Sequence, residues 1–306
     1  MKKNNLGTSG LSISELGLGC MSLGTDEKKA RAIIEAALEE GITYFDTADL
    51  YDFGINEEIV GKALQPVRQD VIIATKVGNR PNEAKDGWTW DPSKKYIKEA
   101  VKNSLRRLQL NHIDLYQLHG GTIEDPIPET IEAFEELKSE GLIRAYGISS
   151  IRPNVIRTFA SQSSIDSVMI QYSLLDRRPE EEVLPLLEKH GISAVTRGPV
   201  SKGLLTPHWR DKMEKVKEKG FLNYNAAELE ELLASIEARL SDNRSMNGLA
   251  FRYNLHHPSV AAVVAGASSV EQVKENIRAV KEHPLSDEEF QLIQELTKAN
   301  RYADHR

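Results

Sequence analysis

Short apolar runs rich in β-branched residues alternate along the chain with longer stretches of helical period. The runs predict buried strands, and the amphipathic stretches between them predict helices that cross over a parallel sheet. Eight such strand and helix pairs follow one another. The predicted strands are residues 15–21, 42–46, 71–77, 113–119, 143–149, 167–172, 192–197 and 260–265.

Proline and glycine punctuate these elements. Asp91-Pro92 and Arg152-Pro153 predict helices with proline at the first position, and Gly41, Gly141 and Gly191 predict helix ends. A ninth helical pattern covers residues 287–300. The pattern predicts an α/β fold, a single (β/α)8 TIM barrel with an additional C-terminal helix, and no linker divides residues 1–306 into separate domains.

The longest irregular stretches, residues 78–90, 120–125 and 198–225, all follow predicted strands. Loops that gather at one end of a barrel are where sites are built. We therefore expect the functional site at the carboxyl ends of the strands.

Composition narrows the class of protein. Forty per cent of the 306 residues are apolar and the net charge is −7, so we expect a globular protein with no nucleic-acid or membrane partner. One cysteine, Cys20, excludes an internal disulfide and a cysteine-rich zinc site, and fits a cytoplasmic location. No signal peptide or spanning segment is evident. The oligomeric state stays open.

A glycine-rich segment near the N-terminus offers an alternative fold. Gly17 and Gly19 follow a predicted strand, as in the dinucleotide fingerprint of doubly wound proteins, and Asp46 ends the next strand. Ser22 stands where the third glycine belongs, and a lone partial fingerprint is weak evidence. Eight consecutive units favour the barrel.

Ionisable residues end or closely follow three of the strands. Asp46, Lys76 and His119 come at the carboxyl ends of strands, and Tyr51 follows Asp46 by five residues. A phenol with an ordinary pKa of about 10 is a poor proton donor at neutral pH. An adjacent lysine ammonium, kept charged by a carboxylate, lowers that pKa, and a histidine can orient a carbonyl oxygen. Each residue alone is more often structural, but the four together predict proton transfer to or from a carbonyl.

No metal site is predicted. The histidines are scattered, and His256-His257 form an adjacent pair before Pro258 rather than two ligands one helical turn apart. This pair is assigned to a helix end.

At these residues the sequence resembles the aldo-keto reductases over essentially its whole length. The segments that carry the resemblance are residues 17–21, 45–51, 75–76, 113–119, 141–149 and 172–177. The resemblance implies the same barrel, a nicotinamide dinucleotide as hydride carrier, and catalytic roles for Tyr51, Lys76, Asp46 and His119.

The resemblance also implies a cofactor-binding set. Ser149 matches the serine that holds the carboxamide. The family usually has a glutamine at the position of Met169, and Gln171, two residues on and on the same strand face, is the candidate to replace it. Arg197 stands where relatives place an aromatic ring. The remaining candidates are Cys20 and Met21 beside Gly19, Lys202 and Gly203 at the pyrophosphate, and Gly266, Ser268, Gln272, Glu275 and Asn276 at the adenosine half. The family favours NADP, and NAD remains possible because Ser268 and Gln272 are neutral.

Two functional hypotheses follow. The first is an NADP-dependent oxidoreductase that binds its cofactor first and transfers hydride to a small aldehyde or ketone, with Tyr51 as the proton donor. The alternative is a nucleotide-binding sensor or regulatory subunit with little turnover, suggested by the unusual Met169 and Arg197. The physiological carbonyl compound is not specified by the sequence, although Phe53, Trp88 and Trp90 can line an apolar pocket.

Overall fold

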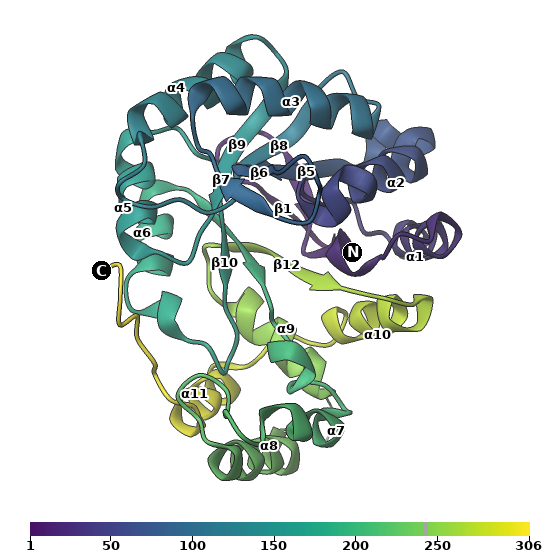
Figure 1. Ribbon diagram of the computed structural model, residues 1–306. Coiled ribbons are helices and arrows are strands. Elements are labelled where there is room, and N and C mark those ends of the chain that lie inside the picture. Colours follow the sequence, from purple (N-terminus) through teal and green to yellow (C-terminus); the bar gives the residue numbers. More distant parts are fainter. Residues whose placement is uncertain (241–243) are drawn as a thin grey trace.

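The computed structural model describes residues 1–240 and 244–306, and eight parallel strands form a closed barrel at its centre (Figure 1). Each strand pairs with its neighbours in parallel register, and β9 and β10 pair to complete the ring. The predicted barrel is confirmed. Its strands are β3 (Leu16–Gly19), β4 (Tyr44–Asp46), β5 (Ile72–Val77), β8 (Ile113–Leu118), β9 (Ile143–Ser149), β10 (Ser167–Gln171), β11 (Ser193–Arg197) and β12 (Val260–Gly266).

The outer helices follow the strands as the periodicity indicates. They are α1 (Glu27–Glu39), α2 (Ile55–Leu64), α3 (Lys94–Leu108), α4 (Ile127–Ser139), α5 (Pro153–Gln162), α6 (Val183–His190), α9 (Met246–His256) and α10 (Val270–Val280). The extra C-terminal helix is α11 (Asp287–Leu296), four residues shorter at its end than predicted.

Local capping chemistry explains where several helices begin. Asp26 caps α1 and Ser245 caps α9, each side chain accepting a hydrogen bond from a backbone N–H of the first turn. Pro153 stands at the first position of α5 as predicted. The same prediction for Pro92 is wrong, because Ser93 is the N-cap of α3.

Several elements were not predicted. An N-terminal hairpin of β1 (Lys3–Asn5) and β2 (Ser12–Ser14) precedes the barrel, and β6 (Asn79–Pro81) pairs with β7 (Trp88–Trp90) in a loop expected to be irregular. The segment after β11 contains α7 (Trp209–Met213), followed by α8 (Ala226–Leu240). In Figure 1, α7, α8 and α11 lie together on one side of the barrel.

Short 3-10 turns complete the set of described elements. They are η1 (Cys20–Ser22), η2 (Tyr51–Gly54), η3 (Gln65–Asp70), η4 (Arg178–Glu180), η5 (Ser201–Gly203) and η6 (Glu214–Val216). The first expected strand, residues 15–21, is therefore too long at its end, since Cys20 and Met21 belong to η1.

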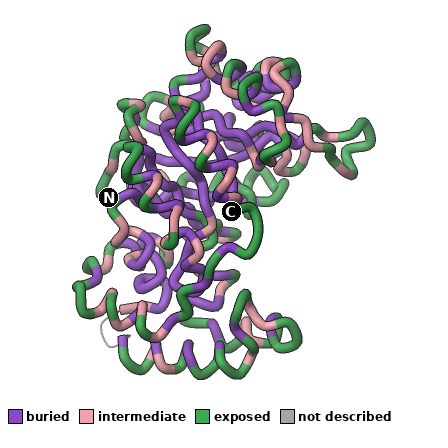
Figure 2. The backbone as a smooth tube through the Cα atoms, turned by 90° about the vertical axis from the view of Figure 1, so that its left-hand side faces the viewer, coloured by how far each residue is buried: buried purple, intermediate pink, exposed green. Residues whose placement is uncertain are grey.

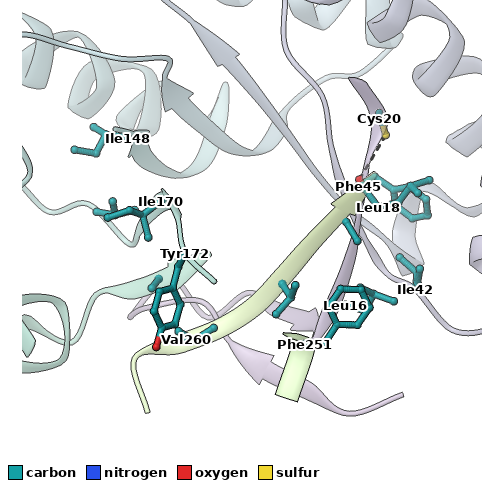
Figure 3. Close-up of a cluster of buried hydrophobic side chains, with 14 of the residues drawn as sticks. Leu16, Leu18, Cys20, Ile42, Phe45, Ile148, Ile170, Tyr172, Phe251 and Val260 are labelled. Carbon is teal, nitrogen blue, oxygen red and sulfur yellow. Dashed lines mark hydrogen bonds between the residues drawn. The ribbon is translucent and has the colours of Figure 1, made fainter. Parts of the chain in front are cut away.

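Apolar side chains form two cores. One lies between the barrel and its helices, with Leu18, Phe45 and Ile170 among the buried residues (Figure 3). The other fills the barrel itself with one side chain from each of several strands, including Tyr44, Ala74, Leu115, Met169 and Val195. Figure 2 shows that buried segments of the chain lie in the interior and that the outer layer is more exposed.

The N-terminal hairpin closes one end of the barrel. Leu6, Leu11 and Ile13 are almost fully buried and join the apolar cluster of the barrel interior. The Asn4 side chain donates a hydrogen bond to the Ala261 carbonyl at 2.8 Å, which ties the hairpin to β12. The opposite end, where the strands finish, remains open to the site.

Within the described residues, no helix combines the length and apolarity needed to cross a lipid bilayer.

Candidate active site

The alternation of side chains along the barrel strands brings three ionisable groups to one end of the barrel. Tyr44 and Ala74 point into the barrel core, so Asp46 and Lys76, two residues further along, point the same way near the carboxyl ends of β4 and β5. His119 directly follows β8, and its backbone N–H donates to the Val77 carbonyl at 2.7 Å. The predicted convergence is present.

Lys76 is the centre of this cluster. Its Nζ donates to Asp46 Oδ1 at 2.5 Å, to the Thr47 carbonyl at 2.7 Å and to Tyr51 Oη at 3.4 Å. An ammonium has three N–H donors, and these three acceptors use them all. The third bond therefore places the phenol oxygen of Tyr51 beside a positive charge.

Tyr51 enters the cluster from the loop after β4. Its backbone N–H donates to the Ala48 carbonyl at 3.2 Å, which turns the chain back over the end of the barrel. Its ring meets the His119 ring edge to face, with centroids 6.0 Å apart. The phenol and the imidazole thus face the same space.

Burial and charge set the protonation states. Burial alone would lower the pKa of Lys76, but Asp46 and Tyr51 together raise it, so the lysine is charged. For His119, burial and the nearby Lys76 lower the pKa to about 3, so the imidazole is neutral at physiological pH. Gln117 adds a hydrogen bond of 3.4 Å to Asp46 Oδ2.

The pKa of Tyr51 differs from the expectation. Burial raises it, and the opposing effect of Lys76 is too small to bring it below the ordinary value of a phenol. The phenol is consequently protonated at neutral pH. What Lys76 provides is a nearby positive charge for the phenolate that remains once the proton has left.

A cavity of about 870 Å³ opens directly over these four side chains. Six of the twelve predicted cofactor residues line it: Met21, Ser149, Arg197, Lys202, Gly203 and Gly266. Arg197 and Lys202 form no ion pair with any carboxylate among the described residues. Lys202 suits the phosphates of a dinucleotide and the planar guanidinium of Arg197 suits an aromatic ring, so the residues present fit a nicotinamide cofactor.

Two more predicted cofactor residues, Cys20 and Gln171, do not line the cavity. Cys20 is fully buried beneath the site and does not line the cavity, because it lies within η1 with its thiol directed at the Leu18 carbonyl. Gln171 is engaged elsewhere: it donates to Asp176 at 2.8 Å and accepts from Arg197 at 3.1 Å. Met169 lines the cavity instead.

The predicted adenosine-binding residues lie just outside the cavity. The Ser268 backbone N–H and hydroxyl both donate to Gln272 Oε1, at 2.8 and 3.0 Å, at the start of α10. Asn276 reaches back to the carbonyl of the cavity residue Gly266 at 3.4 Å. Glu275 is exposed on the same helix. These four residues thus lie within or just before α10, which follows the cavity residue Gly266.

Several lining residues were missed by sequence reasoning. Ile151 and Arg152 lie two and three residues after the end of β9, so their position after a barrel strand was the available signal, as it was for Leu50 after β4. His305 reaches the cavity from the C-terminal tail, which carries no comparable pattern. The three aromatic residues considered as pocket lining, Phe53, Trp88 and Trp90, are absent from the wall, and Trp90 instead donates to Asp125 at 3.0 Å.

His256 ends α9 and His257 follows it, as predicted. In the part of the chain that the structure describes, no three histidine, cysteine, aspartate or glutamate side chains gather in a way that could hold a metal ion.

Comparison with known proteins agrees with this fold. The family model described as "Aldo/keto reductase family" matches residues 15–298. The chain therefore belongs to the aldo/keto reductases, a family of oxidoreductases.

Individual relatives are similar over their full lengths. The chain is 57% identical to the "Uncharacterized oxidoreductase YqkF" of Bacillus subtilis, with all of both chains covered. It is 32% identical to the "NADH-specific methylglyoxal reductase" of Escherichia coli, covering 98% of this chain and 99% of that protein. Among solved structures, the holo form of aldo-keto reductase AKR11C1 from Bacillus halodurans is 60% identical with a TM-score of 0.94, covering 100% of this chain and 99% of that one.

Proposed function

We propose that this protein transfers hydride between NADP(H) and a small aldehyde or ketone, with Tyr51 as the proton donor for reduction. The single observation that carries the proposal is the position of Lys76 Nζ, bonded to both Asp46 and Tyr51 Oη on the floor of a large cavity. A bound nicotinamide dinucleotide supplies the hydride.

The side chains divide the remaining work. Tyr51 donates its phenolic proton to the carbonyl oxygen, and the ammonium of Lys76 stabilises the phenolate that forms. Asp46 keeps the buried Lys76 charged. His119, neutral because its pKa is about 3, donates a hydrogen bond that orients the carbonyl oxygen without competing for its proton.

The cofactor contacts follow the cavity wall. Ser149 is proposed to hold the carboxamide, Arg197 to stack on the nicotinamide, and Lys202 with Gly203 to hold the pyrophosphate. The adenosine half is assigned to Gly266 and the start of α10. NADP(H) is our first choice and NAD(H) remains open, since a relative 32% identical is named as NADH-specific.

The setting is also proposed. We infer that residues 1–306 act as one domain in the cytoplasm, on a small molecule rather than on nucleic acid or a membrane. The net charge of −7 and the single cysteine support this inference.

The direct test follows the absorbance of NADPH and, separately, NADH while the protein meets a panel of aldehydes and ketones. We expect turnover with at least one nucleotide and near-complete loss of it in Tyr51→Phe. Tight nucleotide binding that survives Tyr51→Phe, together with no turnover in the parent protein, would instead support the sensor.

A further inference from the structure

The turn that carries Tyr51 has an unusual backbone. Asp52 and Phe53 have φ values of 49° and 51°, and Gly54 has a φ of 95°, so three consecutive residues occupy the left-handed region. Side chains disfavour that region, and such conformations persist only where surrounding structure enforces them. Something must therefore hold this turn in place.

The side chain of Arg107, from the last turn of α3, lies against the turn. A Cβ added to Gly54 would come within 2.7 Å of Arg107 Cδ and 2.8 Å of its Nε. The arginine thus covers the face that glycine leaves open. The contact lies three residues beyond Tyr51.

A buried carboxylate anchors this arginine. Glu57, in the first turn of α2, is fully buried, and its Oε2 accepts from both Arg107 Nε and Nη2 at 2.6 Å. Its other oxygen accepts from the Thr75 hydroxyl at 2.6 Å. Thr75 immediately precedes Lys76 in β5.

We propose that the Glu57–Arg107 ion pair is a positioning device that holds the Tyr51 turn in register with the Lys76 strand. Glu57 ties the residue before Lys76 to the arginine that packs on the turn after Tyr51. The phenol and the ammonium belong to different elements, and their bond of 3.4 Å leaves room for small displacements. The pair acts through these two residues and touches no reacting atom.

This inference rests on the proposed function, because its readout is carbonyl reduction. A displacement of about 1 Å in a reacting group can lower a rate by about 10²-fold. Such a displacement leaves most binding contacts intact. Loss of the pair is therefore expected in kcat rather than in KM.

The test compares Arg107→Met with a matched control. Arg68 bonds to Asp114, a fully buried carboxylate, at 2.8 Å, but this pair lies at the opposite end of the barrel. Arg68→Met therefore also removes an arginine from a buried carboxylate. Each variant is assayed for thermal unfolding, NADPH binding by protein fluorescence, and kcat and KM with 4-nitrobenzaldehyde. The deuterium isotope effect on kcat is measured with NADPH labelled at the transferred hydrogen.

We expect Arg107→Met to lower kcat at least tenfold, with KM and the NADPH Kd within twofold and an increased isotope effect, because a displaced phenol slows the chemical step. Arg68→Met should lower the melting temperature yet leave kcat and the isotope effect within twofold. Unchanged kcat in folded Arg107→Met overturns the proposal. So does an equal loss of kcat in both variants, which would reflect general destabilisation.

If Arg107→Met does not fold, Arg107→Lys decides. Lysine keeps a positive charge near Glu57 but lacks the planar group that covers Gly54. We expect a threefold or greater loss of kcat, and an unchanged kcat overturns the proposal. If the parent protein reduces no carbonyl compound, the proposed function is wrong. That result is seen in the parent protein and is therefore distinct from an effect of the Arg107 variants.

Discussion

Replacing Lys76 with methionine removes the charge next to the phenol while keeping similar side-chain volume. At 3.4 Å, an ammonium and a phenolate attract each other by about 5 kcal/mol at an effective dielectric constant of about 20. Because about 1.4 kcal/mol corresponds to a tenfold change in rate, this attraction sets a ceiling between 10³- and 10⁴-fold. We expect kcat to fall by about 10³-fold, since solvent and neighbouring dipoles replace part of the lost attraction.

Asp46 does not offset this effect in the variant. Burial already raises the pKa of its carboxyl group, so without the lysine we expect it to be protonated and neutral. KM should change only a fewfold, because His119 and the cavity wall remain. The upper limit on the loss of kcat therefore reflects the removal of one positive charge.

The assay is the steady-state oxidation of NADPH by 4-nitrobenzaldehyde, with thermal unfolding measured on the same samples. Lys62→Met is the control, because Lys62 forms only an exposed ion pair with Glu27 at 3.0 Å. It should leave kcat unchanged. A folded Lys76→Met protein that retains more than a tenth of the parent kcat would refute the electrostatic reasoning.

Three further predictions concern single side chains. Tyr51→Phe should lower kcat at least 10³-fold with the NADPH Kd within twofold; comparable turnover would exclude Tyr51 as the donor. Because the pKa of His119 falls from 6.5 to about 3 on folding, the unfolded state binds its proton first as the pH decreases, so stability is lost between these values. In the parent protein the unfolding free energy falls as the pH decreases from 6.5 to 4, and in His119→Gln this fall should be smaller by about 3 kcal/mol, as measured by urea titrations. An unchanged dependence of the unfolding free energy on pH would contradict this. Gln272→Arg should improve the NADPH Kd relative to that for NADH about tenfold by adding a cation for the 2′-phosphate, and equal changes for both nucleotides would place the adenosine elsewhere.

The sequence was most informative where one constraint acts alone. A buried parallel strand needs a continuous apolar run, so all eight strands of the barrel were predicted. The ionisable residues at the ends of three strands indicated which end of the barrel is open. Asp46 and Lys76 were placed correctly because strand alternation leaves one choice of face.

Sequence patterns are less informative where several partners compete for one side chain. Gln171 has the right face of β10 for a cofactor contact, but Asp176 and Arg197 hold it through contacts that no spacing rule contains. The direction of the Tyr51 pKa depends on the balance between burial and one charge, and burial cannot be read from the residue type. Helix α8 was not predicted although its sequence carries a helical signal, since Leu229, Leu233 and Ile236 are buried at helical spacing.

The N-terminal hairpin closes one end of the described barrel and leaves the other end open. Leu6, Leu11 and Ile13 are packed into the closed end, so within the described residues Lys76 faces the open end, and under the proposed function the nucleotide and the carbonyl compound share one route in and out. Whichever molecule lies deeper must arrive before the other and depart after it. If that molecule is the nucleotide, oxidised nucleotide will compete directly with reduced nucleotide for the free protein, and exchange of one for the other will limit how often the site can be reused.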